Sequence, residues 1–466
     1  MQPEALRRSA TAALSLACFA WSTPGFSGDA RAETAKPESR GYGTKRESEP
    51  PRYVHTLSDT GIEALRGVDW LDFGADLRFR FELRDNDFRR DREALDLPIL
   101  LRTRAYLGLR ELVDPLRFAV EIEDARIANT LFEETDRDVN TVEPIQLYGE
   151  LYFRDLLGRG TPVVVRGGRV AFELLDRRLV ARNEWRNTTN TFQGVQLSLG
   201  ERRSEVQAEL FALQPLDRAM HELDAPHPGQ WFFGAVGALR SWSELFTLEP
   251  YAMRLRQERT ADDAPRDVQH LGLRSFGVVG DTGLDFDAHL AGQLGVVDGR
   301  DHAAAGMVLE GGYTLPHRTK TRLSAQYGYG SGDASPGDRR SGRFDRFYGF
   351  ARPWSNDDYM QWENLHSAKL RVEMWPAKWL QADAGLNAYW LASATDRWNA
   401  AGLRDEAGES GSFIGHELDA RVILRPASRV ALNLGYAYFR AGEFTRNAGR
   451  AGSSNFGYAE LSLSAL

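Results

Sequence analysis

The feature that most constrains the fold is a strict alternation of apolar and polar residues over positions 73–83. Alternate residues form an apolar set and a polar set: Phe73, Ala75, Leu77, Phe79, Phe81 and Leu83 against Gly74, Asp76, Arg78, Arg80 and Glu82. Successive side chains of a β-strand point to opposite faces, so a period of two predicts a strand with one apolar and one charged face. The same rhythm returns in residues 99–110, where Arg102 and Arg104 lie on the polar side.

Alternation of this kind recurs from Trp70 onward. We expect eighteen strands, at residues 70–84, 99–111, 115–126, 144–154, 161–169, 191–200, 203–214, 231–242, 246–259, 268–279, 281–295, 303–315, 318–330, 366–375, 379–393, 414–425, 429–440 and 455–466. Connections after even-numbered strands are short, as at 112–114, 316–317 and 376–378. Those after odd-numbered strands are mostly long, as at 127–143, 170–190, 215–230, 331–365, 394–413 and 441–454.

Connections that are short after even-numbered strands and long after odd-numbered strands are typical of an up-and-down barrel in an outer membrane. Such a barrel has short turns at one rim and long loops at the other. No window holds the ~20 apolar residues that a spanning helix needs, which excludes helical membrane proteins. Several aromatic residues fall near the expected strand ends, where rings sit at lipid headgroups. We therefore predict an all-β protein, with residues 69–466 forming one antiparallel transmembrane barrel of about 18 strands.

The N-terminal residues have the pattern of an export signal. Arg7 and Arg8 precede an apolar run, and small residues follow, which predicts a secretory signal peptide over residues 1–32. Cys18, the single cysteine, lies within it. Residues 33–68 are polar and charged, so we expect a mobile periplasmic leader in front of the barrel.

If the apolar faces meet lipid, the polar faces line a lumen rich in arginine. Arginine supplies all but five of the 58 basic residues. The candidate pore-lining and substrate-binding residues are Arg78, Arg80, Arg84, Arg102, Arg104, Arg117, Arg166, Arg169, Arg274, Arg322, Lys369, Arg371, Asp383, Asp419 and Arg421. Two interpretations stay open: ion pairs that stiffen the wall, or an electropositive conduit for a polyanion.

Motifs for catalysis are not found in the sequence. It has no Gly-x-Ser-x-Gly, His-Glu-x-x-His, phosphate-binding loop or dinucleotide-binding glycine pattern. Aspartates among glycines over residues 332–345 could bind calcium, but a polar outer loop explains them as well. We therefore expect a channel and not an enzyme, with no catalytic residues, no metal, no cofactor and no nucleic-acid partner.

Three stretches of the chain stand out by their residue patterns: residues 168–195, which include Arg169 and Trp185, residues 331–345, and residues 390–419, which end at Asp419. They resemble the alginate export family of outer-membrane barrels. Val170 and Gln193 depart from the pattern, which has Gln and Asp there. The resemblance implies an outer-membrane polysaccharide exporter whose Arg-rich lumen passes a polyuronate.

Two transport functions follow as hypotheses. The first is passive export of an anionic polysaccharide, alginate or a related polyuronate, across the outer membrane of a Gram-negative cell. Its partners would be the polymer, outer-membrane lipid and periplasmic secretion proteins. The alternative is an anion-selective porin for small solutes, which needs no periplasmic partner.

Overall fold

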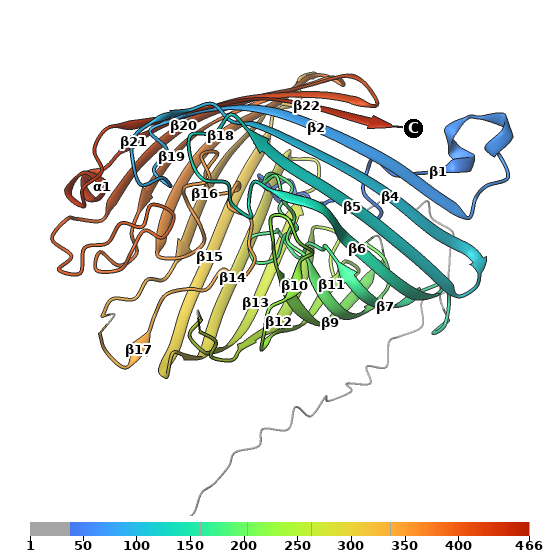
Figure 1. The fold of residues 1–466 in the computed structure, drawn as a ribbon, viewed down its shortest axis with the longest axis horizontal. Helices are drawn as coiled ribbons and strands as arrows, with labels where there is room; N and C mark the ends of the chain where they lie inside the picture. The colour runs from blue at the N-terminus through green and yellow to red at the C-terminus, as the bar shows by residue number, and fades with distance from the viewer. Residues whose placement is uncertain (1–37, 159, 203, 262, 336, 466) are drawn as a thin grey trace, which may run out of the picture. The chain divides into compact units, whose positions relative to one another are not determined.

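The computed structural model describes residues 38–465 except 159, 203, 262 and 336. The expected signal peptide and residues 33–37 lie outside this part of the chain. Eighteen long strands build the sheet (Figure 1). They are β2 (Leu71–Asp85), β4 (Ile99–Val113), β5 (Leu116–Ala128), β6 (Asn140–Phe153), β7 (Val163–Val170), β8 (Phe192–Leu199), β9 (Val206–Asp217), β11 (Gln230–Leu239), β12 (Phe246–Gln257), β13 (Arg266–Val278), β14 (Leu284–Val297), β15 (Arg300–Thr314), β16 (Arg322–Gly330), β18 (Leu365–Ala377), β19 (Leu380–Trp390), β20 (Phe413–Ala427), β21 (Val430–Ala441) and β22 (Ser453–Ala465).

Short elements complete the described chain. Four two-residue strands are β1 (His55–Thr56), β3 (Leu95–Asp96), β10 (Ala225–Pro226) and β17 (Arg340–Ser341). The helices are η1 (Leu57–Thr60), η2 (Glu63–Leu65) and α1 (Glu443–Asn447). No helix in the described residues is long and apolar enough to cross a membrane.

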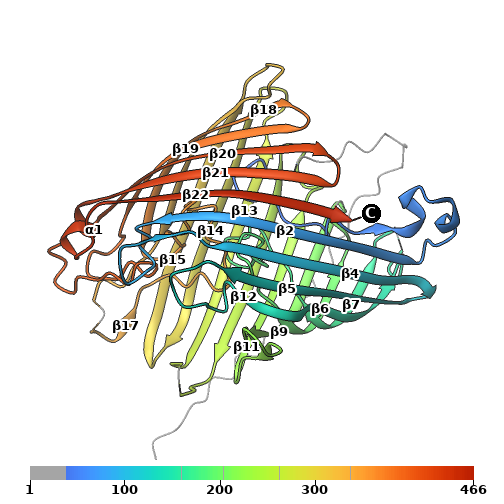
Figure 2. The same ribbon diagram turned by 45° about the horizontal axis from the view of Figure 1, so that its top comes forward.

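The sheet closes on itself. Each long strand pairs antiparallel with its neighbours, and β2 pairs with β22 from Ala75 opposite Ala465 to Asp85 opposite Asn455 (Figure 2). Closure satisfies the backbone groups that would otherwise form open edges. The prediction of an antiparallel barrel of about 18 strands is confirmed. The largest boundary differences occur at the expected starts 144 and 318, where the strands begin at Asn140 and Arg322.

Burial along β2 shows which face meets which surroundings. The apolar Leu77 and Phe79 are 38% and 44% exposed, whereas Arg78 and Arg80, which alternate with them along the strand, are 3% and 2% exposed. This order is the reverse of a soluble sheet, since the apolar face points outward and the charged face inward. An outward apolar band is what a bilayer requires of a barrel.

The two rims of the barrel differ, and we name them by their connections. The turn side carries short connections, such as residues 114–115, 378–379 and 428–429. The loop side carries the long connections. Two of them, together with neighbouring connections, form a hydrophobic cluster. We call residues 171–191 loop A and residues 331–364 loop B.

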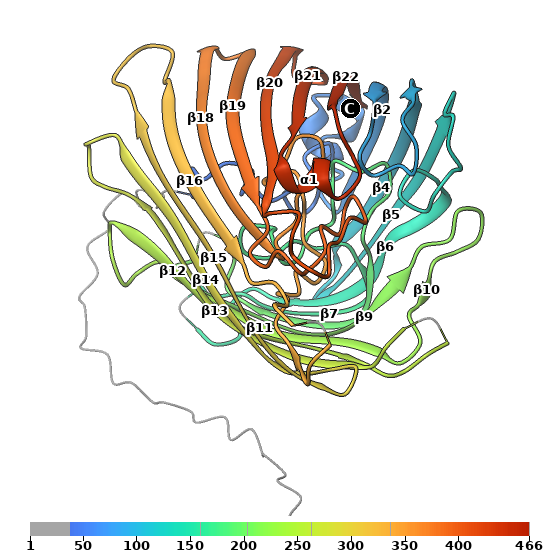
Figure 3. The ribbon, with the colours of Figure 1, turned by 90° about the vertical axis from the view of Figure 1, so that its left-hand side faces the viewer.

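Loops A and B form a hydrophobic cluster with the inward ends of several strands. Leu174 and Leu179 of loop A and Trp354 and Trp362 of loop B are at most 1% exposed. Val180 of loop A forms a parallel β-bridge to Tyr348 of loop B. Figure 3 shows connecting segments within the ring of strands. The lumen therefore contains a packed partition and is not an open tube.

Part of the expected leader also lies against the lumen wall. Residues 39–54, which we call the strap, contact strands around the barrel: Tyr42 N donates to Glu310 Oε1 of β15 at 3.0 Å, and Tyr53 Oη donates to Glu121 Oε1 of β5 at 2.7 Å. This placement differs from the mobile leader that composition predicts. The physical reason is that a polar segment, unable to form its own core, finds charged partners in a polar lumen.

Candidate functional site

Arginines of β2 and β4 hold the tip of loop A by its backbone. Arg78 donates to the carbonyl oxygens of Glu184 and Arg186 at 2.7 and 2.8 Å, and Arg102 donates to the Glu184 carbonyl at 3.2 Å. Hydrogen bonds from a charged donor are stronger than neutral ones. These arginines therefore fix a loop across the lumen.

The side chain of Glu184 adds a second anchor. It accepts from Arg104 at 2.7 Å and lies 2.7 Å from Arg182 and 3.3 Å from Arg102. Burial alone would raise the pKa of Glu184, but the neighbouring guanidinium groups outweigh burial and hold that pKa well below its usual range. The carboxylate thus stays charged in its arginine cradle at neutral pH.

Ion pairs on the opposite wall involve more carboxylates than cations. Arg322 alone reaches Asp285 at 2.6 Å, Glu310 at 2.9 Å and Glu373 at 2.9 Å. We define the acid-rich wall as the following ion-paired, inward residues of β12 to β20: Arg274, Arg322, Arg371 and Arg421 with Glu249, Asp285, Asp287, Glu310, Glu373, Asp383 and Asp419. Four cations there face seven carboxylates. Lys369 beside them donates to the Pro353 carbonyl at 2.6 Å.

The remaining predicted residues are paired as well. Arg80 and Arg84 contact Glu82, Arg117 and Arg166 contact Glu150, and Arg169 contacts Glu143. All fifteen predicted residues thus have a polar or charged partner, in line with ion pairs that stiffen the wall. That any of them binds a substrate stays a prediction.

The largest cavity described lies on the turn side and has a volume of about 1140 Å³. Among the described residues that line it, eleven are Arg or Lys and four are Glu. Only Arg78, Arg102, Arg322 and Arg421 of the predicted set are among them. Lys45 of the strap and Arg318, Lys320 and Lys378 of the turns also line it, and they make no ion pair within the described chain. Such a cavity attracts anions.

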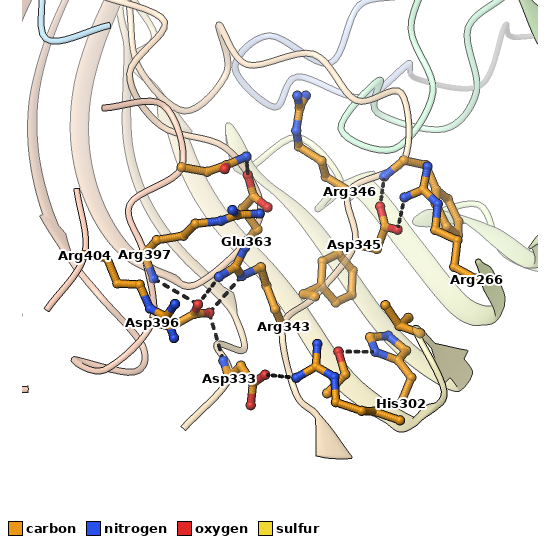
Figure 4. A pocket seen from close by; sticks show the side chains of 16 residues that line it. Arg266, His302, Asp333, Arg343, Asp345, Arg346, Glu363, Asp396, Arg397 and Arg404 are labelled. Atoms are coloured by element: carbon orange, nitrogen blue, oxygen red, sulfur yellow. Dashed lines mark hydrogen bonds and ion pairs between the residues drawn. The ribbon is translucent and has the colours of Figure 1, made fainter. Parts of the chain in front are cut away.

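A second cavity, of about 540 Å³, lies on the loop side (Figure 4). Six arginines line it: Arg266, Arg300, Arg343, Arg346, Arg397 and Arg404. Asp333, Asp345, Glu363 and Asp396 accompany them. No group of three or more metal-ligating side chains in the described residues could hold a metal ion. Loop B contributes to both cavities, since Arg346 lines this one and Arg352 the turn-side one.

The sequence matches the profile of the alginate export family over residues 69–459. This match covers most of the chain and nearly all of the barrel. The chain belongs to the alginate export family. No curated protein matches the sequence.

Solved structures with a similar fold are outer-membrane proteins of porin type. OprD of Pseudomonas aeruginosa is 14% identical, with 85% of this chain and 93% of that chain covered and a TM-score of 0.54. OccAB3 of Acinetobacter baumannii is 13% identical, with 85% and 99% covered and a TM-score of 0.57. At this identity the likeness concerns the fold. Together with membership of the alginate export family, it places the chain among outer-membrane channels.

The stretches that resemble the alginate export family meet in space. Asp396, 1% exposed, accepts from Asp333 N at 2.9 Å, from Arg343 Nε at 2.8 Å and from Arg397 N at 2.9 Å. One carboxylate therefore ties loop B to the β19–β20 loop beside the loop-side cavity. The β-bridge between Val180 and Tyr348 links the first stretch to loop B. These stretches fix the partition inside the barrel.

Sequence reasoning missed seven of the eleven described cations that line the turn-side cavity and all six described arginines of the loop-side cavity. The composition around Lys45 predicts a mobile leader, and Lys320 and Lys378 lie in turns, where a charge is ordinarily solvated. The arginines of the loop-side cavity lie on loops or strand ends. A usable signal was present, since lysine is rare in this chain and three of its five lysines line the turn-side cavity.

Asp357 of loop B gives a pH-dependent prediction. It is 2% exposed, and neither carboxylate oxygen has a hydrogen-bond partner among the described residues. Burial, and then Glu417, raise its pKa well above the usual range. Between the unfolded pKa of about 4 and the folded pKa, the folded state binds more protons, so stability falls as pH rises. We expect Asp357→Asn to stabilise the barrel by about 1–3 kcal/mol at pH 7 and hardly at pH 4, measured by urea unfolding at both values. An equal effect at both pH values would contradict this account.

Proposed function

We propose that this member of the alginate export family passes an anionic polysaccharide, alginate or a related polyuronate, outward through its lumen. The observation that supports this most is the excess of cations in the turn-side cavity, eleven Arg or Lys against four Glu. A polyuronate carries a carboxylate on each sugar, and rings of positive charge favour its entry.

The direction of transport rests on the proposal that the turn side faces the periplasm, as short turns do in bacterial barrels. A chain arriving from the periplasm would then meet Lys45, Arg318, Lys320 and Lys378 first. Because these cations have no ion-pair partner in the described chain, a ligand can bind them without breaking an ion pair of the protein. Deeper residues such as Arg322, in contrast, already form ion pairs with carboxylates of the wall.

The proposed channel is passive. The motive force would come from polymer synthesis in the inner membrane and from periplasmic secretion proteins. Those proteins would have to deliver the chain to the turn-side cavity. The turn-side rim is the surface available for such a partner.

The packed partition favours a second candidate, an anion-selective porin for small solutes. Loops A and B bury Leu174, Leu179, Trp354 and Trp362 in the lumen, which narrows any path. A small carboxylate passes a narrow path more easily than a polymer does. Under this candidate, transport would fall steeply with oligomer length.

Efflux from proteoliposomes tests the proposal. Vesicles are loaded with fluorescent oligouronates of increasing length, and neutral oligoglucosides of equal length serve as controls. The proposal expects uronate efflux at every length tested, at least about tenfold faster than neutral efflux, and slowed by Lys320→Gln with Lys378→Gln. Efflux of only the shortest uronates would favour the small-solute porin, and equal efflux of both sugars would contradict charge selection.

A further inference from the structure

The strap binds the wall mainly by donating hydrogen bonds to carboxylates. Ser39 Oγ donates to Asp287, Tyr42 N donates to both oxygens of Glu310 at 3.0 and 3.1 Å, and Glu47 N donates to Glu173 at 2.7 Å. The Tyr42 ring lies 3.8 Å from the Arg371 guanidinium. Two of these acceptors, Asp287 and Glu310, belong to the acid-rich wall.

Charge along the strap matches the surface beneath each part of it. Residues 39–46 contain Arg40, Lys45 and Arg46, and Arg46 lies 4.0 Å from Glu249 of the acid-rich wall. The acidic part follows at once, and Glu49 lies 3.0 Å from Arg166 of β7. The acid-rich wall has three more carboxylates than cations, and the strap brings three cations to that region. Complementary charge fixes the register of the contact.

Two glycines allow this close approach. Gly43 has φ of +72°, and a Cβ there would lie 2.9 Å from Pro353 Cγ of loop B. At Gly41 a Cβ would lie 2.9 Å from Asp287 Oδ2. A larger residue at Gly41 would push the strap away from the wall, and one at Gly43 would push it away from loop B.

We infer that the strap is a resident ligand of the acid-rich wall and strengthens the preference of the channel for anions. It occupies wall carboxylates and places Arg40 and Lys45 in a turn-side cavity whose other described lining residues already carry more cations than carboxylates. The strap is therefore a specificity-determining element and more than an obstruction. This inference rests on the proposed function.

Docking of the strap has a test that does not depend on transport. A Cβ on Gly41 would lie 3.3 Å from Asp287 Cβ, close to the ~3.5–4.5 Å of a disulfide. We expect the full-length variant Gly41→Cys with Asp287→Cys to form the intramolecular disulfide on mild oxidation, detected by peptide mass spectrometry. Gly67→Cys with Asp287→Cys is the control and should not, because Gly67 has open space around it. Failure of the first pair to cross-link would overturn the placement.

Selectivity is tested in a planar bilayer under a KCl gradient. The variant Arg40→Gln, Lys45→Gln, Arg46→Gln should lower the anion-to-cation permeability ratio about threefold or more, with little change in conductance. Gly43→Val, which displaces the strap, should lower the ratio and raise the conductance. Gly67→Val should change neither.

The outcomes separate this inference from the proposed function. If Gly43→Val raises conductance while both variants keep the wild-type ratio, the strap is only a plug and the inference is overturned. If no variant changes either quantity, the strap has no role in permeation and the inference is also overturned. A wild-type channel that prefers cations would refute the proposed function, whereas the disulfide result would stand independently.

Discussion

Replacing Arg322 with methionine is expected to lower the free energy of unfolding of the barrel by about 3–5 kcal/mol. Arg322 lies within 3.0 Å of three carboxylates, Asp285, Glu310 and Glu373, and its own side chain is 3% exposed. Removing the guanidinium leaves three buried carboxylates facing one another without a cation, which is the costly way to break a buried network. Urea unfolding in lipid vesicles, followed by tryptophan fluorescence, measures the loss.

The matched control is Arg254→Gln on β12. Arg254 pairs with Asp267 at 2.6 Å, but the two side chains are 48% and 41% exposed. An exposed pair contributes about 0–1 kcal/mol, so this variant should unfold almost as the wild type does. Equal effects of the two substitutions would show that the acid-rich wall does not depend on Arg322.

Removing the arginines that anchor loop A should open the channel. In the variant Arg78→Gln with Arg102→Gln, the carbonyl oxygens of Glu184 and Arg186 lose charged donors. Each such hydrogen bond contributes about 1.5–3 kcal/mol, so the tip of loop A should leave its fixed position. We expect single-channel conductance to rise at least about twofold, with added current noise, in planar bilayers.

The control for this variant changes two other lumen arginines. Arg110 and Arg117 have Asp72 and Glu150 as their ion-pair partners, and neither pairs with loop A or loop B. Arg110→Gln with Arg117→Gln removes the same charge and should leave conductance close to wild type. If the Arg78 and Arg102 variant also conducts normally, loop A does not restrict the path.

The barrel was predictable because its signal is repeated. Each strand alternates apolar and polar residues, and closure of the sheet forces the faces of all strands to agree. Phe79 outside and Arg80 inside on β2 are the direct result. Small boundary errors, as at Asn140 and Arg322, do not change which face a residue occupies.

The contents of the lumen were not predictable in the same way. Loops A and B have no repeating pattern, and their positions depend on partners distant in sequence, such as Arg78 with Glu184 and Asp333 with Asp396. The alternation identified Arg78 as inward but gave no means to tell a free guanidinium from one bound to a backbone carbonyl. Likewise, the composition of the strap predicts that this segment cannot form a core of its own. The carboxylates that hold it, such as Glu310 and Glu173, are distant in sequence.

The central claim is a lumen that selects anions and admits a polyuronate. The measurement that tests it most directly is the reversal potential of the purified, refolded channel in a planar bilayer under a salt gradient, repeated with oligomannuronate on one side. We predict anion selectivity and block of the current by the oligomer. Cation selectivity, or weak selectivity without block, would mean that the lumen cations are neutralised within the wall, and would contradict the account.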